Sequence, residues 1–124
     1  MTVRVRNQTR DKILADHAQL ATGFWERLRG LMGRTQFDVG EGLHIVPCNS
    51  FHTFFMRLPI DALFLDREGG VVKVHHCLAP WRATAIYFRA HSVLELPAGT
   101  AAASGCLEGD RLAFEKLATP PKDL

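Results

Sequence analysis

The sequence predicts a mainly β fold, a single-domain sandwich or barrel of short strands with one short helix packed against it. At least six runs of residues are apolar or alternate between apolar and polar side chains, and only one stretch repeats with the period of a helix. Gly and Pro interrupt these runs at short intervals, as is typical of turns between strands. The connections are too short for parallel strands joined by a helix, so we expect antiparallel neighbours.

Composition bounds the domain organisation. The chain has 124 residues, of which 47% are hydrophobic and 23% charged, as in an ordinary globular protein. No internal stretch is rich enough in Pro, Gly and Ser to separate two cores. We expect a loose N-terminal arm over residues 1–10, one β domain over residues 11–116 and a frayed tail over residues 117–124.

Charge and hydropathy exclude several kinds of partner. The net charge is only +2 and the arginines are spread along the chain, so we expect no nucleic-acid binding. No apolar run is long enough to span a bilayer. The N-terminal residues lack the apolar core of a secretory signal, which predicts a cytoplasmic protein as the sequence is written. Export stays open if a leader has been removed.

Three cysteines, Cys48, Cys77 and Cys106, are widely spaced, and each lies beside apolar residues. An odd number excludes a complete disulfide framework. We expect buried free thiols in a reducing compartment, while one pairing among the three stays open.

The first strands and the helix follow from local patterns. Residues 12–16 alternate weakly, and residues 19–21 are expected to return as a hairpin partner. The helix is predicted at residues 23–32, where Thr22 can cap its start and Gly33 can end it. One face of this helix carries three apolar residues, Phe24, Leu28 and Leu31. Arg27 and Arg29 are expected to point away.

The other strands are short runs bounded by Gly and Pro. We expect them at residues 43–46, 51–56, 60–65, 71–78, 86–88, 92–96 and 111–116, with a brief helical turn between residues 100 and 105. The run 60–65 is apolar on both faces apart from Asp61, which predicts a strand with a neighbour on each side. The stretch 52–66 is therefore the expected centre of the sheet.

Asp61 and Glu95 are acidic residues within apolar strands, where an isolated ionised carboxylate is costly unless it is paired. His52 and Arg57 are candidate partners of Asp61. If the two carboxyls faced each other, repulsion would raise one pKa and place a proton donor beside an acceptor. The alternative is that Arg, backbone N–H groups or solvent satisfies each of them.

Two further groups of residues, one on a loop and one at a strand end, are weaker candidates for a binding site. Trp81 and Arg82 could stack against a sugar or another planar ligand, or Trp81 could simply cover an open edge of the sheet. His75 and Cys77 would share one face of a strand, but no complete set of metal ligands accompanies them. We therefore expect no metal and no cofactor.

Several distinctive segments occur together and in order. They are the helix ending GLM (residues 30–32), EGLHIVPC (41–48), HTFFMRLPIDALFLD (52–66), residues 70–72, VLELPAG (93–99) and the turn 105–110. In these segments the chain resembles the prokaryotic family named domain of unknown function 192, DUF192, over residues 10–116. The resemblance implies a small jelly-roll-like β sandwich with one packed helix. Many members of the family resemble exported or lipid-anchored proteins, whereas this sequence shows no leader.

Three hypotheses for function stay open. The first is a non-enzymatic module that binds a small ligand, a glycan or a protein. Its candidate residues are His52, Arg57, Asp61, Trp81, Arg82 and Glu95. The second is a small hydrolase or metal-assisted enzyme that uses His52, Asp61, His75 and Glu95. The third is an assembly or interaction protein that pairs with another chain through a sheet edge. We expect the protein itself to be a monomer or a weak homodimer.

Overall fold

The protein is mainly β, as predicted. The fold is taken from a computed structural model and described for residues 2–117. Its strands are β1 (Thr2–Asn7), β2 (Lys12–Ala21), β3 (Glu41–Ile45), β4 (Ile60–Leu65), β5 (Val71–Leu78), β6 (Ser92–Pro97) and β7 (Leu112–Lys116). Two short helices, α1 (Phe24–Arg29) and α2 (Thr100–Ser104), complete the elements, and the helical turn expected before residue 105 is α2.

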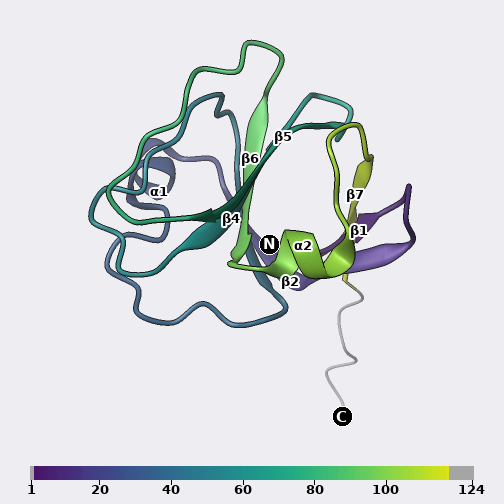
Figure 1. Cartoon of the computed structure of the whole chain (residues 1–124), viewed down its shortest axis with the longest axis horizontal. Helices are drawn as coiled ribbons and strands as arrows, with labels where there is room; N and C mark the ends of the chain where they lie inside the picture. The colour runs from purple at the N-terminus through teal and green to yellow at the C-terminus, as the bar shows by residue number, and fades with distance from the viewer. Residues whose placement is uncertain (1, 118–124) are drawn as a thin grey trace.

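All seven strands belong to one curled sheet, in the order β5-β4-β6-β3-β2-β1-β7 (Figure 1). Neighbours are antiparallel except β2 and β3, which run parallel from His17 opposite Glu41 to Ala21 opposite Ile45. The connection between these two strands contains α1 and is long enough for a crossover. The expectation of antiparallel neighbours throughout is therefore wrong at this position.

The two ends of the curled sheet meet at one point, which makes the sheet a half-barrel. Gly70, just before β5, forms an isolated antiparallel bridge with Arg111, just before β7. The Leu112 amide donates a hydrogen bond of 2.8 Å to the carbonyl oxygen of Gly69. Gly69 has a φ of +84°, and a Cβ there would collide with the Leu112 carbonyl oxygen. Only glycine fits this junction without strain.

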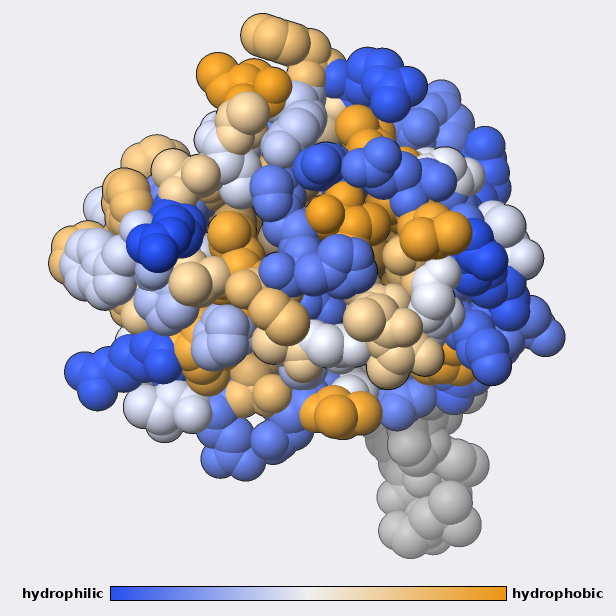
Figure 2. Space-filling view, in the orientation of Figure 1, coloured by the Kyte–Doolittle hydropathy of each residue, from blue (hydrophilic) through white to orange (hydrophobic). Residues whose placement is uncertain are grey.

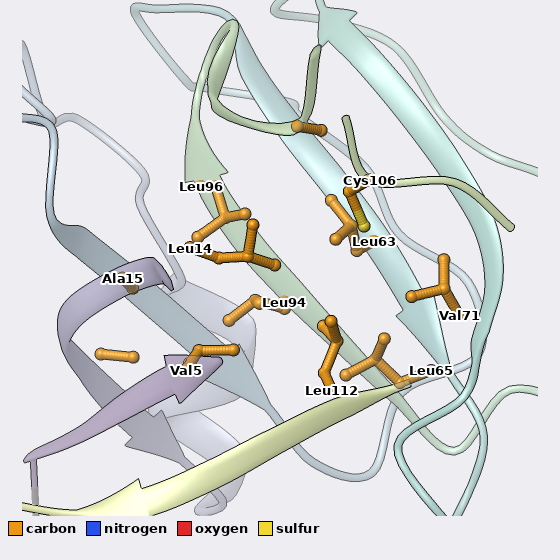
Figure 3. Close-up of a cluster of buried hydrophobic side chains, with 12 residues drawn as sticks. Val5, Leu14, Ala15, Leu63, Leu65, Val71, Leu94, Leu96, Cys106 and Leu112 are labelled. Carbon is orange, nitrogen blue, oxygen red and sulfur yellow. The ribbon is translucent and has the colours of Figure 1, made fainter. Parts of the chain in front are cut away.

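Apolar side chains fill the inside of the half-barrel (Figure 3). They come from six of the strands, from α2 and from the segment that follows it. The buried residues of this inner core are Val5, Leu14, Ala15, Ala18, Leu63, Leu65, Val71, Leu94, Leu96, Ala101, Cys106 and Leu112. α2 contacts β2, β5 and β6 and so covers one end of this inner core.

A second apolar core lies on the outer face of β4 and β6, under α1 and the long loops drawn on that side of the sheet (Figure 1). Its buried members are Leu31, Met56, Ile60, Ala62, Phe64 and Val93. Successive residues of β4 and β6 alternate between the two cores, and every residue of both strands is buried. The two faces predicted for residues 60–65 are thus confirmed.

Some apolar side chains remain at the surface. Figure 2 shows them in several separate places on the viewed face, interrupted by polar surface. Trp25 is 75% exposed and Phe88 is 89% exposed. Within residues 2–117, neither helix is long and apolar enough to cross a membrane.

The N-terminal residues differ from the expectation. Thr2–Asn7 is not a loose arm but strand β1, which pairs with both β2 and β7. Lys12–Ala21 is one continuous strand rather than a hairpin with a turn at His17 and Ala18. The β1–β2 pairing contains register shifts, and such irregularities interrupt the two-residue alternation by which a strand is identified. The expected tail lies largely outside the described residues.

Two expected strands are loops. Residues 51–56 and 86–88 contribute no named strand, and Phe55 adopts a φ of +66°, which breaks an extended run. β4 is internal but lies next to the edge strand β5, so the stretch 52–66 is not the centre of the sheet. The helix is shorter than predicted, beginning after Gly23 and ending at Gly30.

Candidate functional site

Glu95 lies in the middle of β6 with its side chain on the outer face of the sheet. It pairs in register with Leu43 of β3 and Ala62 of β4, so its strand neighbours offer no polar side chain. Glu95 is fully buried, and neither of its carboxyl oxygens has a hydrogen-bond partner within residues 2–117. Burial raises the pKa of this carboxyl to about 8. A buried acid that the protein itself leaves unsatisfied calls for a functional explanation.

A cavity of about 230 Å³ opens beside Glu95. Its walls come from α1, from the end of β3 and from the loop that follows β3. The walls are largely apolar and include Phe24, Leu31, Ile45, Phe51 and Met56. Ligand pockets combine apolar walls with a few polar groups, and this cavity is smaller than the roughly 300–1,000 Å³ of most such pockets.

Gly30 at the end of α1 leaves space next to the carboxyl. Its φ is +46°, which disfavours other residues. A Cβ at this position would lie 3.8 Å from Oε1 of Glu95. The backbone therefore approaches Glu95 without supplying a side chain to cover it.

Arg27 lines the same cavity from α1. Its Nε is buried and has no hydrogen-bond partner among the described residues, and its Nη1 donates a long bond of 3.4 Å to the carbonyl oxygen of Pro47. Arg27 and Glu95 make no ion pair in the part of the chain that the structure describes. Glu26 accepts a hydrogen bond of 3.0 Å from the Gly23 amide, which closes the first turn of α1.

The face that α1 presents differs from the prediction. Arg27 was expected to point away from the core, but it is half-buried against the cavity. Phe24 and Leu28 were expected to be core residues, but they are 63% and 49% exposed. A helix of six residues has too few turns to define one apolar face. Arg27 was missed for this reason.

Cys48 is half-buried and lines the same cavity as Glu95. Its thiol donates a hydrogen bond of 2.9 Å to the carbonyl oxygen of Ser50. Burial raises the pKa of the thiol, and the nearby Glu95 acts in the same direction. Because the thiolate is the nucleophilic form, this environment does not favour a nucleophilic role.

His52, Trp81 and Arg82 lie on two loops held together by Thr53. The Thr53 hydroxyl donates to the Ala79 carbonyl oxygen at 2.6 Å and accepts from the Arg82 amide at 2.9 Å. His52 lines the cavity and is exposed at its edge. Trp81 is 55% exposed. These three candidates are thus near one another, on one side of the cavity.

An exposed aromatic cluster connects them. It consists of His52, Phe54, Phe55 and Trp81. The ring of Phe54 stacks on His52 with centroids 4.8 Å apart, and that of Phe55 lies 4.7 Å from Trp81. Arg82 is exposed, and its Nη1 donates a long hydrogen bond of 3.4 Å to the Trp81 carbonyl oxygen.

Asp61 and Arg57 lie away from the cavity. Asp61 points to the inner face, where its oxygens accept hydrogen bonds of 2.8 Å each from the backbone amides of Cys77 and Ala101. Arg57 is exposed and makes no ion pair in the described part of the chain. The structure does not bring His52, Arg57 and Asp61 together, nor does it place Asp61 against Glu95.

His75 shares the outer face with Glu95 but is not beside it. His75 and Glu95 flank Ala62 from the two neighbouring strands, which separates their backbones by about 10 Å. The His75 ring instead makes a hydrogen bond of 2.9 Å with the hydroxyl of Tyr87. Within residues 2–117, no three His, Cys, Asp or Glu side chains are grouped as metal ligands.

Solved structures share this fold. A Sinorhizobium meliloti protein, named provisionally as a transcription regulator, matches with a TM-score of 0.77 and 28% identity over 91% of this chain and 92% of its own. A Novosphingobium aromaticivorans protein of unknown function matches with a TM-score of 0.78 and 24% identity over 91% of this chain and 84% of its own. The second likeness concerns the fold alone.

Sequence relatives lead to one family. UPF0127 proteins from two archaea are similar to this chain: one from Pyrococcus furiosus is 31% identical over 116 residues, 90% of this chain and 97% of the relative. One from Thermococcus sibiricus is 30% identical over 114 residues, 88% of this chain and 73% of the relative. The model of the family DUF192, described as Uncharacterized ACR, matches residues 5–114. The chain therefore belongs to the DUF192 family.

Proposed function

We propose that this protein is a binding module that takes a small ligand into the cavity beside Glu95. One observation carries the proposal: the carboxyl of Glu95 is fully buried in the cavity wall, and neither oxygen has a partner among the described residues. A ligand that donates hydrogen bonds would satisfy this group, and the apolar walls would take the rest of the molecule.

Stability alone does not account for Glu95. Burying a polar group without a hydrogen bond costs roughly 1–3 kcal/mol in proteins. Leu43 and Ala62, its register partners, show that this row of the sheet otherwise carries apolar residues. An apolar residue at position 95 would fit the same surroundings at lower cost. A residue that lowers stability in this way is typical of functional sites.

The same geometry supports binding over hydrolysis. General acid–base catalysis needs a second group within hydrogen-bond reach of the reacting atoms. Asp61 projects from the other face of the sheet, and His75 bonds to Tyr87. His52 is exposed at the cavity edge, where its Nδ1 accepts a hydrogen bond of 3.3 Å from the Phe54 amide. Glu95 thus has no catalytic partner comparable to a dyad in the part of the chain described.

The name of the Sinorhizobium meliloti relative raises a role in transcription. A recognition helix reads bases by lying in the major groove. α1 and α2, the helices within residues 2–117, have six and five residues. At 1.5 Å per residue they span less than about 10 Å. This favours ligand binding over direct base readout for the described fold.

A fragment screen tests the proposal. Uniformly nitrogen-15-labelled protein is titrated with a library of molecules of roughly 8–15 non-hydrogen atoms, and amide chemical shifts are followed by NMR. We expect hits whose largest shift changes fall on Gly30, Leu31, Cys48 and Glu95, because these residues surround the carboxyl. Hits that map only to other surfaces, or a library without hits, would contradict the proposal.

A matched pair of variants locates the contact. Glu95→Leu removes the buried carboxyl, whereas Glu115→Leu removes an exposed one on β7. We expect hits that donate hydrogen bonds to lose affinity in the first variant by roughly tenfold or more, since a hydrogen bond to a carboxyl contributes about 1–3 kcal/mol. Affinity in the second variant is expected to stay unchanged.

A further inference from the structure

Arg27 and Glu95 place two complementary groups, each with unsatisfied hydrogen-bonding atoms, in the wall of one cavity. Glu95 offers two buried carboxyl oxygens, and neither has a hydrogen-bond partner in the part of the chain that the structure describes. Arg27 offers a buried Nε–H that likewise has no partner among those residues. Because the two side chains make no ion pair with each other within residues 2–117, neither satisfies the other.

The number of free atoms defines the group that fits Glu95. Two oxygens need at least two donor hydrogens for both to be satisfied. A hydroxyl supplies one, whereas a primary ammonium supplies three. An ammonium also carries the charge that would compensate an ionised carboxylate in an apolar wall. Glu95 therefore fits an amine better than an alcohol.

The charge of Arg27 defines the other end of the ligand. Ion pairs in the described part of the chain use other cations, namely Arg6, Arg10, Arg34 and Lys73. Among the described residues, the side chain of Arg27 makes only the long hydrogen bond to the Pro47 carbonyl oxygen. The guanidinium is always charged and binds carboxylates in a defined geometry. A carboxylate is the group that satisfies both its charge and its free Nε–H.

We infer that the ligand of this cavity is a small aminocarboxylate, with its amine on Glu95 and its carboxylate on Arg27. This inference rests on the proposed function and specifies the chemical class of the ligand. Leu31, Ile45 and Met56 in the cavity wall suit a short hydrocarbon portion between or beside the two charged groups. The small volume of the cavity restricts the ligand to roughly the size of a single amino acid.

Proton release gives this inference a specific signature. At pH 7 the free carboxyl of Glu95 is mostly protonated, because burial raises its pKa to about 8. A bound ammonium favours the ionised carboxylate, so binding releases a proton to the buffer. A ligand that offers a hydroxyl leaves the carboxyl protonated and releases none.

Isothermal titration calorimetry tests the inference at pH 7, in two buffers of different ionisation enthalpy. The probes are L-leucine, 4-aminobutyrate and 6-aminohexanoate, with butylamine and butyrate as single-charge controls. We expect at least one aminocarboxylate to bind roughly tenfold or more tightly than both controls, with release of about one proton. No binding by any aminocarboxylate, or binding without proton release, overturns the inference.

Variants assign each end of the ligand. Glu95→Gln is expected to abolish proton release and to weaken the aminocarboxylate to about the affinity of butyrate. Arg27→Gln is expected to weaken it to about the affinity of butylamine. Arg4→Gln, on an exposed residue of β1, is expected to change neither value. Equal loss of butyrate and butylamine binding in both cavity variants would contradict the two-ended arrangement.

The two proposals fail in different ways. If neutral or singly charged fragments shift the amides around Glu95 but no aminocarboxylate binds, the site exists and its ligand class is wrong. If neither fragments nor aminocarboxylates perturb these amides, the binding function itself is wrong.

Discussion

Asp61 and Glu95 lie on neighbouring strands of one sheet but project from opposite faces. Asp61 is in register with Leu96, and Glu95 is in register with Ala62. On the inner face, two backbone amides donate hydrogen bonds to Asp61. On the outer face, nothing in the described chain donates to Glu95. Asp61 thus links β4 to β5 and to α2, whereas Glu95 has no such partner and lies at a cavity.

The pH dependence of stability tests the burial of Glu95. Its pKa is raised from 4.5 to about 8, so the folded state keeps a proton that the unfolded state loses. The contribution of Glu95 to the free energy of unfolding is therefore most favourable below about pH 4.5 and falls as pH rises towards 8, by at most about 1.4 kcal/mol per pH unit. Glu95→Gln is expected to flatten this fall between pH 6.5 and 8 in urea denaturation.

Glu115→Gln provides the control, because Glu115 is exposed on β7. It is expected to keep the wild-type slope. An unchanged slope in Glu95→Gln would mean that the carboxyl is hydrated in solution.

His44 gives the opposite pH dependence. Burial, and secondarily the charge of His91, lower its pKa from 6.5 to about 4. The folded state keeps the ring neutral, so this contribution to stability is complete above pH 6.5 and is lost as pH falls towards 4. Between about pH 4.5 and 6.5 the slopes due to His44 and Glu95 oppose each other. His44→Phe is expected to make the protein more stable relative to wild type at pH 4.5 than at pH 7, again measured in urea.

The exposed His76 supplies the comparison. His76→Phe is expected to leave the pH profile unchanged. His44→Phe also retains an aromatic ring against Phe114, whose centroid lies 4.2 Å from that of His44.

Asp61→Ala tests how much the hydrogen bonds of Asp61 on the inner face of the sheet stabilise the fold. The substitution removes the acceptor of two amides, that of the buried Ala101 and that of Cys77, which is an exposed residue. We expect a loss of roughly 2–4 kcal/mol in the free energy of unfolding, since an unsatisfied buried donor costs about 1–3 kcal/mol and the lost hydrogen bond of Cys77 adds to it. Asp16→Ala, at an exposed position of β2, is expected to change it by less than about 0.5 kcal/mol. Near-equal losses would exclude an anchoring role for Asp61.

The closure of the half-barrel can be tested with two glycines. Gly69 and Gly109 both have positive φ, but a Cβ meets the Leu112 carbonyl oxygen only at Gly69 and has open space at Gly109. Gly109→Ala therefore reports backbone strain alone, roughly 1 kcal/mol. Gly69→Ala is expected to cost clearly more and to speed hydrogen exchange at the Leu112 amide. Similar costs for both substitutions would show that the junction can relax.

The sequence was sufficient to identify the strands with complete apolar faces. β4 and β6 were predicted nearly to the residue because both sides of each strand are apolar and Gly or Pro follows. β5 and β7 were bounded by turn residues. β1 was missed because its alternation is short and lies among charged residues, so that its place depends on pairing with β7.

The candidate site could be predicted only in part. Glu95 was identified because an acid in an apolar strand is unusual in any context. Arg27 was not, because its orientation depends on where a six-residue helix packs, and helix periodicity does not determine that. Whether Asp61 faces Glu95 was left open by the sequence, because facing pairs depend on register, which a single sequence does not provide.

The pairing of β1 with β7 has a consequence for the order of folding. Val3 of β1 lies opposite Lys116 of β7, so almost the whole described chain separates two adjacent strands. Contacts this distant in sequence form late, because the ends of a long loop must first be brought together. While the chain is still being synthesised, β1 can pair with β2 but exposes its other edge. Until β7 has been synthesised and pairs with β1, that edge can form hydrogen bonds with a strand of another chain. We therefore expect aggregation mainly during synthesis in cells.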